Sequence, residues 1–290
     1  MTELTDKEKR KAEKREKRDK DKVGEMSFFD HLEELRWHII RSFVAVLVLA
    51  VVAFIEQKFI FEQIIFKPKS PDFWTNRMFA KVGEFFGTSG AGTEQKGLEI
   101  INITVAGQFS MSMWTAIVAG IIGASPIIFW EFWRFIKPAL YENEKRVATG
   151  AVFYTTILFL LGVLFGYFLI IPLSINFFAN YSISETVANQ ITISSYISMV
   201  VSIVLSSGVV FLLPVITYSL SRVGLLTPDF MKRYRKHAIV LLFLLSAIIT
   251  PPDVFSQFVV AIPLVILYEF SIFISARAIR INEKKERMNS

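Results

Sequence analysis

Residues 150–171 read GAVFYTTILFLLGVLFGYFLII, a stretch without one charged side chain. A helix that crosses the hydrocarbon core of a bilayer needs about 20 apolar residues, so this stretch is long enough to span it. The composition agrees, because 53% of the residues are hydrophobic. A soluble domain of this length would need more polar residues to cover its surface. The sequence therefore predicts an all-α protein that crosses the membrane.

Six such spans are expected along the chain. The first is interrupted only by Arg41, whose long side chain is expected to reach the membrane interface. The last two are expected to be short, because a helix of about 12 residues covers only about 20 Å at 1.5 Å per residue. A re-entrant hairpin is the alternative for that pair. The expected spans are 37–55, a stretch within 100–130, 147–171, 196–220, 238–249 and 255–275.

Basic residues predict the orientation of the chain. Lys and Arg concentrate in short loops on the cytoplasmic side of a membrane protein. They occur in 131–146, in 221–237 and after Ser275, whereas 172–195 contains neither. Both termini are therefore predicted to be cytoplasmic. The expected divisions are a charged tail at 1–26, a six-helix membrane domain at 27–277 and a second tail at 278–290.

The sequence also disfavours several classes of function. The net charge of +6 comes from bases beside apolar runs, which is typical of membrane proteins and not of nucleic-acid binding. Cysteine is absent, and no metalloprotease, hydrolase, P-loop or dinucleotide-binding motif occurs, so no enzyme, cofactor or metal site is expected. The three histidines, His31, His38 and His237, are expected to pack or hydrogen-bond at helix ends. A solute transporter is disfavoured because spans three to five carry no charge, and a scaffold without cargo is the other alternative.

Two segments at the predicted cytoplasmic boundary carry distinctive polar residues. The first, SFFDHLEELR at 27–36, spaces its apolar side chains three and four apart and predicts an amphipathic interfacial helix. The second, SPIIFWEFWRFIKPALYENEKR at 125–146, brings aromatic residues and alternating charge to the expected first cytoplasmic loop. Each segment alone also fits an aromatic belt with solvated charges.

Together the two segments resemble the TatC family of twin-arginine protein translocase subunits. The family pattern H-L-x-E-L-R matches 31–36, and its loop pattern, with W-x-F-x-x-P-A/G-L-Y and E-[RK]-R, matches within 125–146. A third and more specific match is TPPDVFSQ at 250–257, with Ala-Ile-Pro following at 261–263. The resemblance covers about residues 27–277 in order.

The resemblance implies a role in protein export. TatC-like proteins bind twin-arginine signal peptides at the cytoplasmic face of the bacterial inner membrane. With single-span TatA/TatB-type partners, and with self-association, they export folded proteins by using the proton motive force. The signal-peptide residues carried over are Glu34, Arg36, Phe135, Pro138, Glu144 and Arg146. Partner helices are expected to dock at Thr250 and Gln257, and Pro68 matches a proline that opens the first external loop.

Two positions depart from the family pattern. Leu212 stands where the family often has a glutamate in the fourth span. An ionisable side chain in lipid is costly and usually functional, so its absence affects the expected docking of partners. Gln257 and Thr250 are therefore expected to carry more of that docking. His38 stands where a second basic residue after Arg36 is common.

Overall fold

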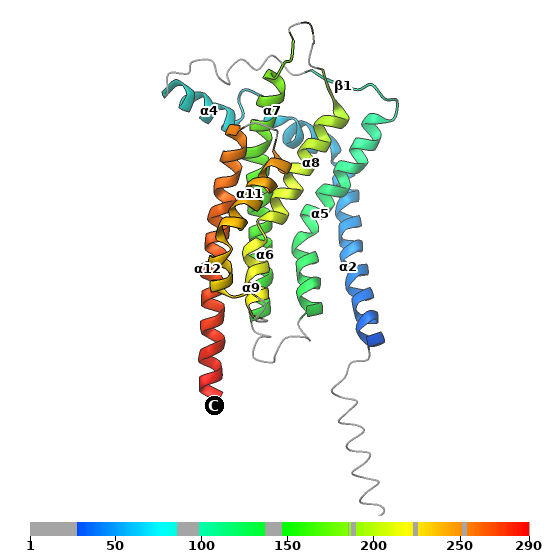
Figure 1. The fold of residues 1–290 in the computed structure, drawn as a ribbon. Coiled ribbons are helices and arrows are strands. Elements are labelled where there is room, and N and C mark those ends of the chain that lie inside the picture. The colour runs from blue at the N-terminus through cyan, green and yellow to red at the C-terminus, as the bar shows by residue number, and fades with distance from the viewer. Residues whose placement is uncertain are drawn as a thin grey trace, which may run out of the picture.

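The computed structural model describes residues 28–85, 99–136, 147–184, 186, 190–222, 226–250 and 254–289. Most of these residues are helical, and the long helices stand side by side in one bundle (Figure 1). Helix α2 (Phe28–Ile55) begins and helix α5 (Gly107–Ile136) ends at the same end of the bundle, drawn at the bottom of Figure 1 and called the lower end below. The predicted all-α class is confirmed.

Five helical stretches are long and apolar enough to cross a membrane. They correspond to the first, second, third, fourth and last of the six predicted spans. The remaining one, α11 (Arg235–Ile249), has 15 residues and is therefore only about 22 Å long. The count of six spans accordingly stays a prediction. The five stretches are Leu32–Ile55, Gly107–Phe135, Gly150–Asn180, Ile193–Ser221 and Ser256–Arg277.

The first two long helices extend beyond their predicted spans. Helix α2 is continuous, so the predicted interfacial segment and the first span form one helix. Helix α5 runs through Pro126 to Ile136, so Glu131 and Arg134 belong to a helix and not to the predicted loop. The reason is that Glu and Arg are good helix formers. A charged residue marks the edge of the hydrocarbon core, but it does not end a helix.

The third and fourth spans are each built from segments. The third consists of α6 (Val147–Phe165), the five-residue π-helix η5 (Gly166–Ile170) and α7 (Ile171–Asn180). Residues 171–180, most of them predicted to lie in a loop, are therefore helical. The fourth consists of α8 (Ile193–Val210) and α9 (Leu213–Arg222). These two meet just before Pro214, which cannot donate a backbone hydrogen bond to the preceding turn.

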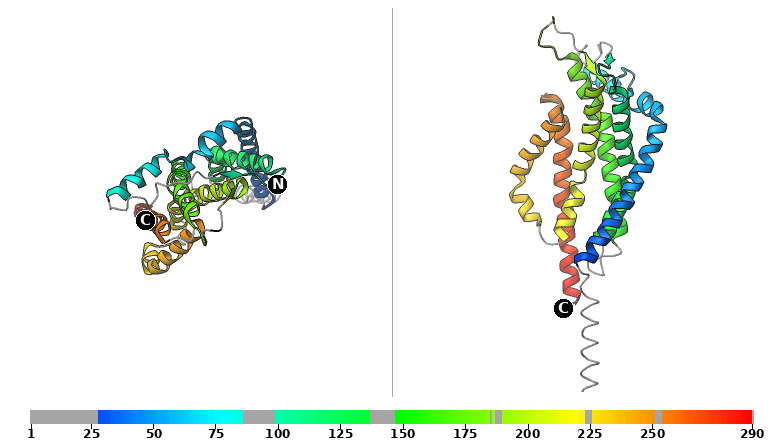
Figure 2. Two further views of the ribbon diagram at one scale, coloured as in Figure 1. Left: turned by 90° about the horizontal axis from the view of Figure 1, so that it is seen from above. Right: turned by 90° about the vertical axis from the view of Figure 1, so that its right-hand side faces the viewer.

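The last helices form a hairpin on the side of the bundle opposite α2 (Figure 2). A short helix, α10 (Pro228–Arg233), occupies part of the basic segment predicted to be a loop. Helix α11 then runs beside α12 (Val254–Asn289), which has 36 residues and also packs against α9. Helix α12 is thus longer than the short last span that was expected, and it continues through the predicted tail after residue 277.

The segment after α2 folds onto the upper end of the bundle as α3 (Gln57–Phe59), the π-helix η1 (Ile60–Ile65), the 3-10 helix η2 (Lys67–Lys69) and α4 (Trp74–Phe85). The buried Asn76 amide ties this segment together by donating to the carbonyl oxygens of Pro68 and Ser70 at 3.2 and 2.9 Å. Strand β1 (Ile100–Ile101) pairs in parallel with β2 (Ile191–Thr192). This pairing joins the residues that precede α5 to those that precede α8.

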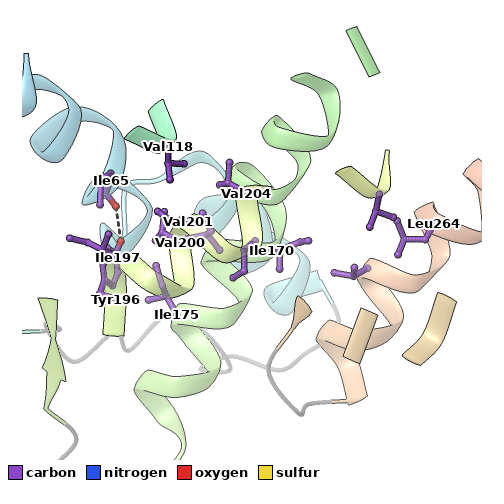
Figure 3. Packing of buried hydrophobic residues seen from close by; sticks show 14 of the residues in the cluster. Ile65, Val118, Ile170, Ile175, Tyr196, Ile197, Val200, Val201, Val204 and Leu264 are labelled. Carbon is purple, nitrogen blue, oxygen red and sulfur yellow. Dashed lines mark hydrogen bonds between the residues drawn. The ribbon is translucent and has the colours of Figure 1, made fainter. Parts of the chain in front are cut away.

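The apolar core surrounds α8. Its buried side chains pack against Ile170 and Ile175 of the third span, as Figure 3 shows. The Tyr196 hydroxyl donates to the Ile65 carbonyl oxygen at 2.7 Å and joins η1 to this core. A Cβ atom on Gly162 would lie only 2.5 Å from the Ser207 carbonyl oxygen, so glycine is what lets α6 approach α8. The α8 side chains labelled in Figure 3 are Tyr196, Ile197, Val200, Val201 and Val204.

Helix α2 is less enclosed by the bundle, because only 6% of its apolar stretch is buried. Its contacts are made mainly with α5. A Cβ atom on Gly120 of α5 would lie 2.7 Å from the Val46 carbonyl oxygen and 2.8 Å from the Ala50 nitrogen. The two backbones therefore touch at Gly120.

We predict that Gly120→Ala destabilises the protein by about 1–3 kcal/mol, because the added methyl group meets backbone that cannot rotate away. The matched control is Gly150→Ala, since a Cβ at Gly150 meets nothing within 4 Å. That variant is expected to match or exceed the wild type, because alanine is the better helix former. Thermal unfolding of the detergent-purified proteins, followed by circular dichroism, measures both. Equal melting temperatures for the two variants would contradict the close approach of α2 and α5.

Candidate functional site

Four ionisable side chains meet where α2 begins and α5 ends. His38 and Glu131 are 4% and 6% exposed, and the His38 Nδ1 atom contacts Glu131 Oε2. Arg41 Nε donates to the same oxygen at 3.0 Å. On the other side of the imidazole ring, His38 Nε2 lies 3.8 Å from Glu34 Oε1. We call Glu34, His38, Arg41 and Glu131 the boundary cluster.

The spacing along α2 explains why three of these residues share a face. Glu34, His38 and Arg41 lie four and three residues apart, which places them above one another on one side of a helix. Helix α5 runs antiparallel to α2 and brings Glu131 to the same level. A buried carboxylate is costly unless it is paired and hydrogen-bonded, and here both His38 and Arg41 bond it.

The hydrogen-bond pattern also assigns the proton on the imidazole ring. His38 Nδ1 contacts the Glu131 carboxylate and lies 3.0 Å from Arg41 Nη2. A ring nitrogen cannot accept from Arg41 and donate to a carboxylate at once. The closer contact is the one with Glu131, so we assign Nδ1 as an N–H donor to it. The Nε2 atom is then the ring nitrogen that faces Glu34.

Phe135 joins this cluster from α5. It lies one turn beyond Glu131, and its ring meets the His38 ring edge-on at a centroid distance of 6.0 Å. Glu34 and Phe135, both predicted from the resemblance to be signal-peptide residues, are thus brought together by His38. His38 therefore packs and hydrogen-bonds as expected, but it lies well inside α2 and not at a helix end.

The other predicted signal-peptide residues do not join the cluster. Arg36 lies over the Trp37 ring, with its guanidinium carbon 5.6 Å from the ring centroid. Two residues correspond to about 200° around a helix, so Arg36 faces away from Glu34. Three further residues lie outside the described part of the chain: Pro138, Glu144 and Arg146.

Sequence reasoning missed the pairing of Arg41 with Glu131. Arg41 was expected to reach the interface, and its side chain is 44% exposed, but its Nε atom is bonded to Glu131. Glu131 was assigned to a loop and given no role. One signal was present in the sequence. Arg41 interrupts the first apolar run near its start, and Glu131 closes the second. Two opposite charges are therefore expected at a similar depth in neighbouring antiparallel helices.

The predicted partner-docking residues lie at the turn between α11 and α12. Gln257 Nε2 donates across the hairpin to the Phe243 carbonyl oxygen at 3.2 Å. Thr250 is buried, and its hydroxyl donates to the Ser246 carbonyl oxygen of its own helix at 2.8 Å. The side-chain oxygen of Gln257 takes part in neither of these two bonds. Near the other end of α11, Arg235 bonds Glu269 of α12.

Leu212 lies where α8 gives way to α9 and is half-buried. One turn and a residue earlier, the Ser207 hydroxyl is buried and makes no hydrogen bond with the described residues. Most serines in such helices bond to their own backbone, and this one does not. The fourth span thus has a buried hydroxyl near the position where the family often has a glutamate. A hydroxyl cannot replace the negative charge of that glutamate.

No group of three or more His, Asp or Glu side chains in the described part of the chain is placed to hold a metal ion. The cluster is instead an arrangement of carboxylates and cations at the end of a long apolar bundle. These features define a multi-pass membrane protein with a cluster of charged side chains at one end of its bundle.

A model of the family described as Sec-independent protein translocase protein (TatC) matches residues 30–263. The chain belongs to this family, and it is a translocase component that acts independently of the Sec system. The TatC proteins of Blattabacterium and Aquifex aeolicus are 43% and 34% identical to it. The alignments cover 88% and 90% of this chain and 97% and 98% of those proteins.

A solved structure supports the same conclusion. The crystal structure of a "Twin Arginine Translocase Receptor- TatC in DDM" is similar with a TM-score of 0.65 and 33% sequence identity. The match covers 84% of this chain and 99% of that one. The family resemblance expected from the three sequence motifs is therefore confirmed.

We predict that Arg41→Leu lowers the stability of the protein by about 1–3 kcal/mol, because it removes one of two partners from a buried carboxylate. The double variant Arg41→Leu/Glu131→Leu should lose less than the sum of its two single variants. The control is Arg77→Leu, whose ion pair with Asp72 is exposed on both sides and is therefore expected to contribute little. Thermal unfolding in detergent tests this, and strict additivity would argue against the pair.

Proposed function

We propose that this chain is the subunit of the twin-arginine translocase that binds twin-arginine signal peptides at the cytoplasmic face of the inner membrane. The observation that carries the proposal is the position of Glu34. Within the boundary cluster, Glu131 is buried beneath two partners, whereas Glu34 is 35% exposed at the lower end of α2. An arginine arriving from solution reaches the Glu34 carboxylate first.

The chemistry of this carboxylate suits arginine. A guanidinium group binds a carboxylate through two parallel hydrogen bonds, a geometry that the ammonium group of lysine cannot reproduce. Charge-assisted bonds of this kind contribute roughly 1.5–3 kcal/mol each. Apolar contacts with the rest of the signal peptide then supply much of the affinity. Phe135, whose ring meets the ring of His38, is proposed to take part in them.

The paired arginines call for a second carboxylate. The family resemblance assigns this role to Glu144, which follows α5 in the chain. Arg36 and Arg146, and also Pro138, are proposed to shape the surface around the two carboxylates. Two glutamates on separate elements, each binding one arginine, would account for recognition of a pair.

Orientation and partners complete the proposal. The basic residues of α10 and of the start of α11 support a cytoplasmic lower end, since Lys and Arg accumulate on that side. Single-span TatA/TatB-type proteins are proposed to dock at Gln257, beside Thr250. Together with these partners, and through self-association, the protein supports export of folded cargo driven by the proton motive force. It catalyses no covalent reaction in this role.

We predict that Glu34→Ala and Glu144→Ala each weaken binding of a twin-arginine peptide roughly 10- to 100-fold, as expected for the loss of one charge-assisted bond. The matched control is Glu33→Ala, because Glu33 is the exposed neighbour of Glu34 on α2. Fluorescence anisotropy of a labelled signal peptide with the protein in nanodiscs measures the affinity.

The same assay compares the twin-arginine peptide with a variant in which both arginines are lysines. Wild-type protein should prefer arginine, and Glu34→Ala should lose most of that preference. If both glutamate variants bind the arginine peptide as tightly as the wild type does, the proposed recognition site is wrong.

We predict that Gln257→Leu releases the partner helix, because a polar residue in a partner span needs a polar counterpart in lipid, at about 1 kcal/mol per bond. Leu212→Glu should be tolerated and restore part of the docking in that background. The control is Gln108→Leu, an exposed glutamine of α5. Co-purification of a tagged TatA/TatB-type partner from membranes reports the outcome. Normal co-purification with Gln257→Leu would refute the docking site.

A further inference from the structure

The position of Glu131 is not explained by direct binding of a signal peptide. It is 6% exposed, and its Oε2 atom is already bonded by both Arg41 and His38. Arg41 of this chain therefore already occupies the position at Glu131 that an incoming arginine would need. An incoming guanidinium group meets Glu34 as the accessible carboxylate of the boundary cluster.

His38 connects the two carboxylates. Its Nδ1 atom contacts Glu131, and its Nε2 atom lies 3.8 Å from Glu34 Oε1. The ring is also held edge-on by Phe135. With one nitrogen bonded to a buried carboxylate and one edge against Phe135, the imidazole ring has a single orientation, and in that orientation it presents Nε2 to Glu34.

A partly exposed glutamate otherwise samples several side-chain conformations, and binding must then order it. Restricting a side chain before the ligand arrives lowers that entropic cost and so increases affinity. The His38 ring, whose Nε2 atom lies 3.8 Å from Glu34 Oε1, supplies such a restriction by limiting the space in which the Glu34 side chain can move. Each carboxylate oxygen can accept more than one hydrogen bond, so both Glu34 oxygens remain available to a guanidinium group.

We propose that Glu131 is a positioning residue for signal-peptide recognition, because it holds His38 in the orientation that places the Glu34 carboxylate. This inference rests on the function proposed above. Arg41 has a supporting part, since it shares the buried Glu131 oxygen and compensates its charge. The contact between two helices thereby becomes part of the recognition site, although Glu131 itself never touches the peptide.

A double-mutant cycle in the peptide-binding assay tests this inference. Glu131→Ala alone should weaken binding of the twin-arginine peptide roughly 3- to 30-fold, the range expected for coupled neighbours. In the Glu34→Ala background, Glu131→Ala should change the affinity less than 2-fold, because the residue it positions is gone. An equal loss in both backgrounds, or no loss in either, would overturn the proposal.

Further variants separate positioning from a general structural role. Ser112→Ala removes the hydrogen bond to Gln57 at the opposite end of the α2–α5 pair and should leave peptide affinity unchanged. His38→Phe keeps a ring beside Phe135 but removes both nitrogens, so it should reproduce the loss seen with Glu131→Ala. Wild-type affinity in His38→Phe would refute the route through the imidazole ring.

A conservative variant covers the case in which Glu131→Ala fails to fold, as judged by size-exclusion chromatography. Glu131→Gln retains an oxygen that accepts from His38 Nδ1, and it should bind the peptide more tightly than His38→Phe does. Equal affinities for these two variants would overturn the proposal.

The cycle also distinguishes this inference from the proposed function. If Glu34→Ala loses affinity but Glu131 shows no coupling to it, only the positioning role is wrong. If Glu34→Ala binds like the wild type, the recognition site and the inference fall together.

Discussion

A polar group inside the hydrocarbon core has no water to bond, and this constraint governs most of the structure. Backbone amides and carbonyls must find partners within the protein, which leaves helices as the practical way for these segments to cross. Even the irregular parts obey it. The five-residue π-helix η5 keeps the third span continuous between α6 and α7, and the one carbonyl that Tyr196 reaches belongs to the end of η1. Some charged side chains of the described helices are likewise paired, as in Arg41 with Glu131 and Arg235 with Glu269.

Packing within the bundle is uneven, and the difference matters for the site. Around α8, glycines at the interface with α6 let the helices approach closely, and buried aliphatic side chains fill the space between them. Helix α2 lies at the edge and depends on α5 alone for most of its contacts. Two features hold it there: the backbone contact at Gly120 and the bonds from His38 and Arg41 to Glu131. Glu34, the carboxylate proposed for recognition, is carried by this helix, so its position depends strongly on those few contacts.

Much of this could be predicted from the sequence, and the failures have two physical causes. Uncharged runs gave the positions of the long helices, because a span must be apolar over its whole length. Helix ends were predicted poorly, because the limit of the hydrocarbon core is not the limit of a helix, as Glu131 and the extension of α12 show. The motifs led to Glu34 and Phe135. The partners of His38 and Arg41 were missed because Glu131 is 93 and 90 residues away, and a one-dimensional pattern does not show which helices pack together.

The pairing of Arg41 with Glu131 has a consequence for how the protein is made. A ribosome adds roughly 5–20 residues per second, so the 90 residues between them separate their synthesis by roughly 5–20 s. Throughout this interval, α2 emerges with an arginine whose acidic partner does not yet exist. The long Arg41 side chain can keep its charge at the water interface meanwhile. The synthesis of α5 then supplies Glu131, so the charge of Arg41 can be paired before the helices that follow α5 in the chain are made.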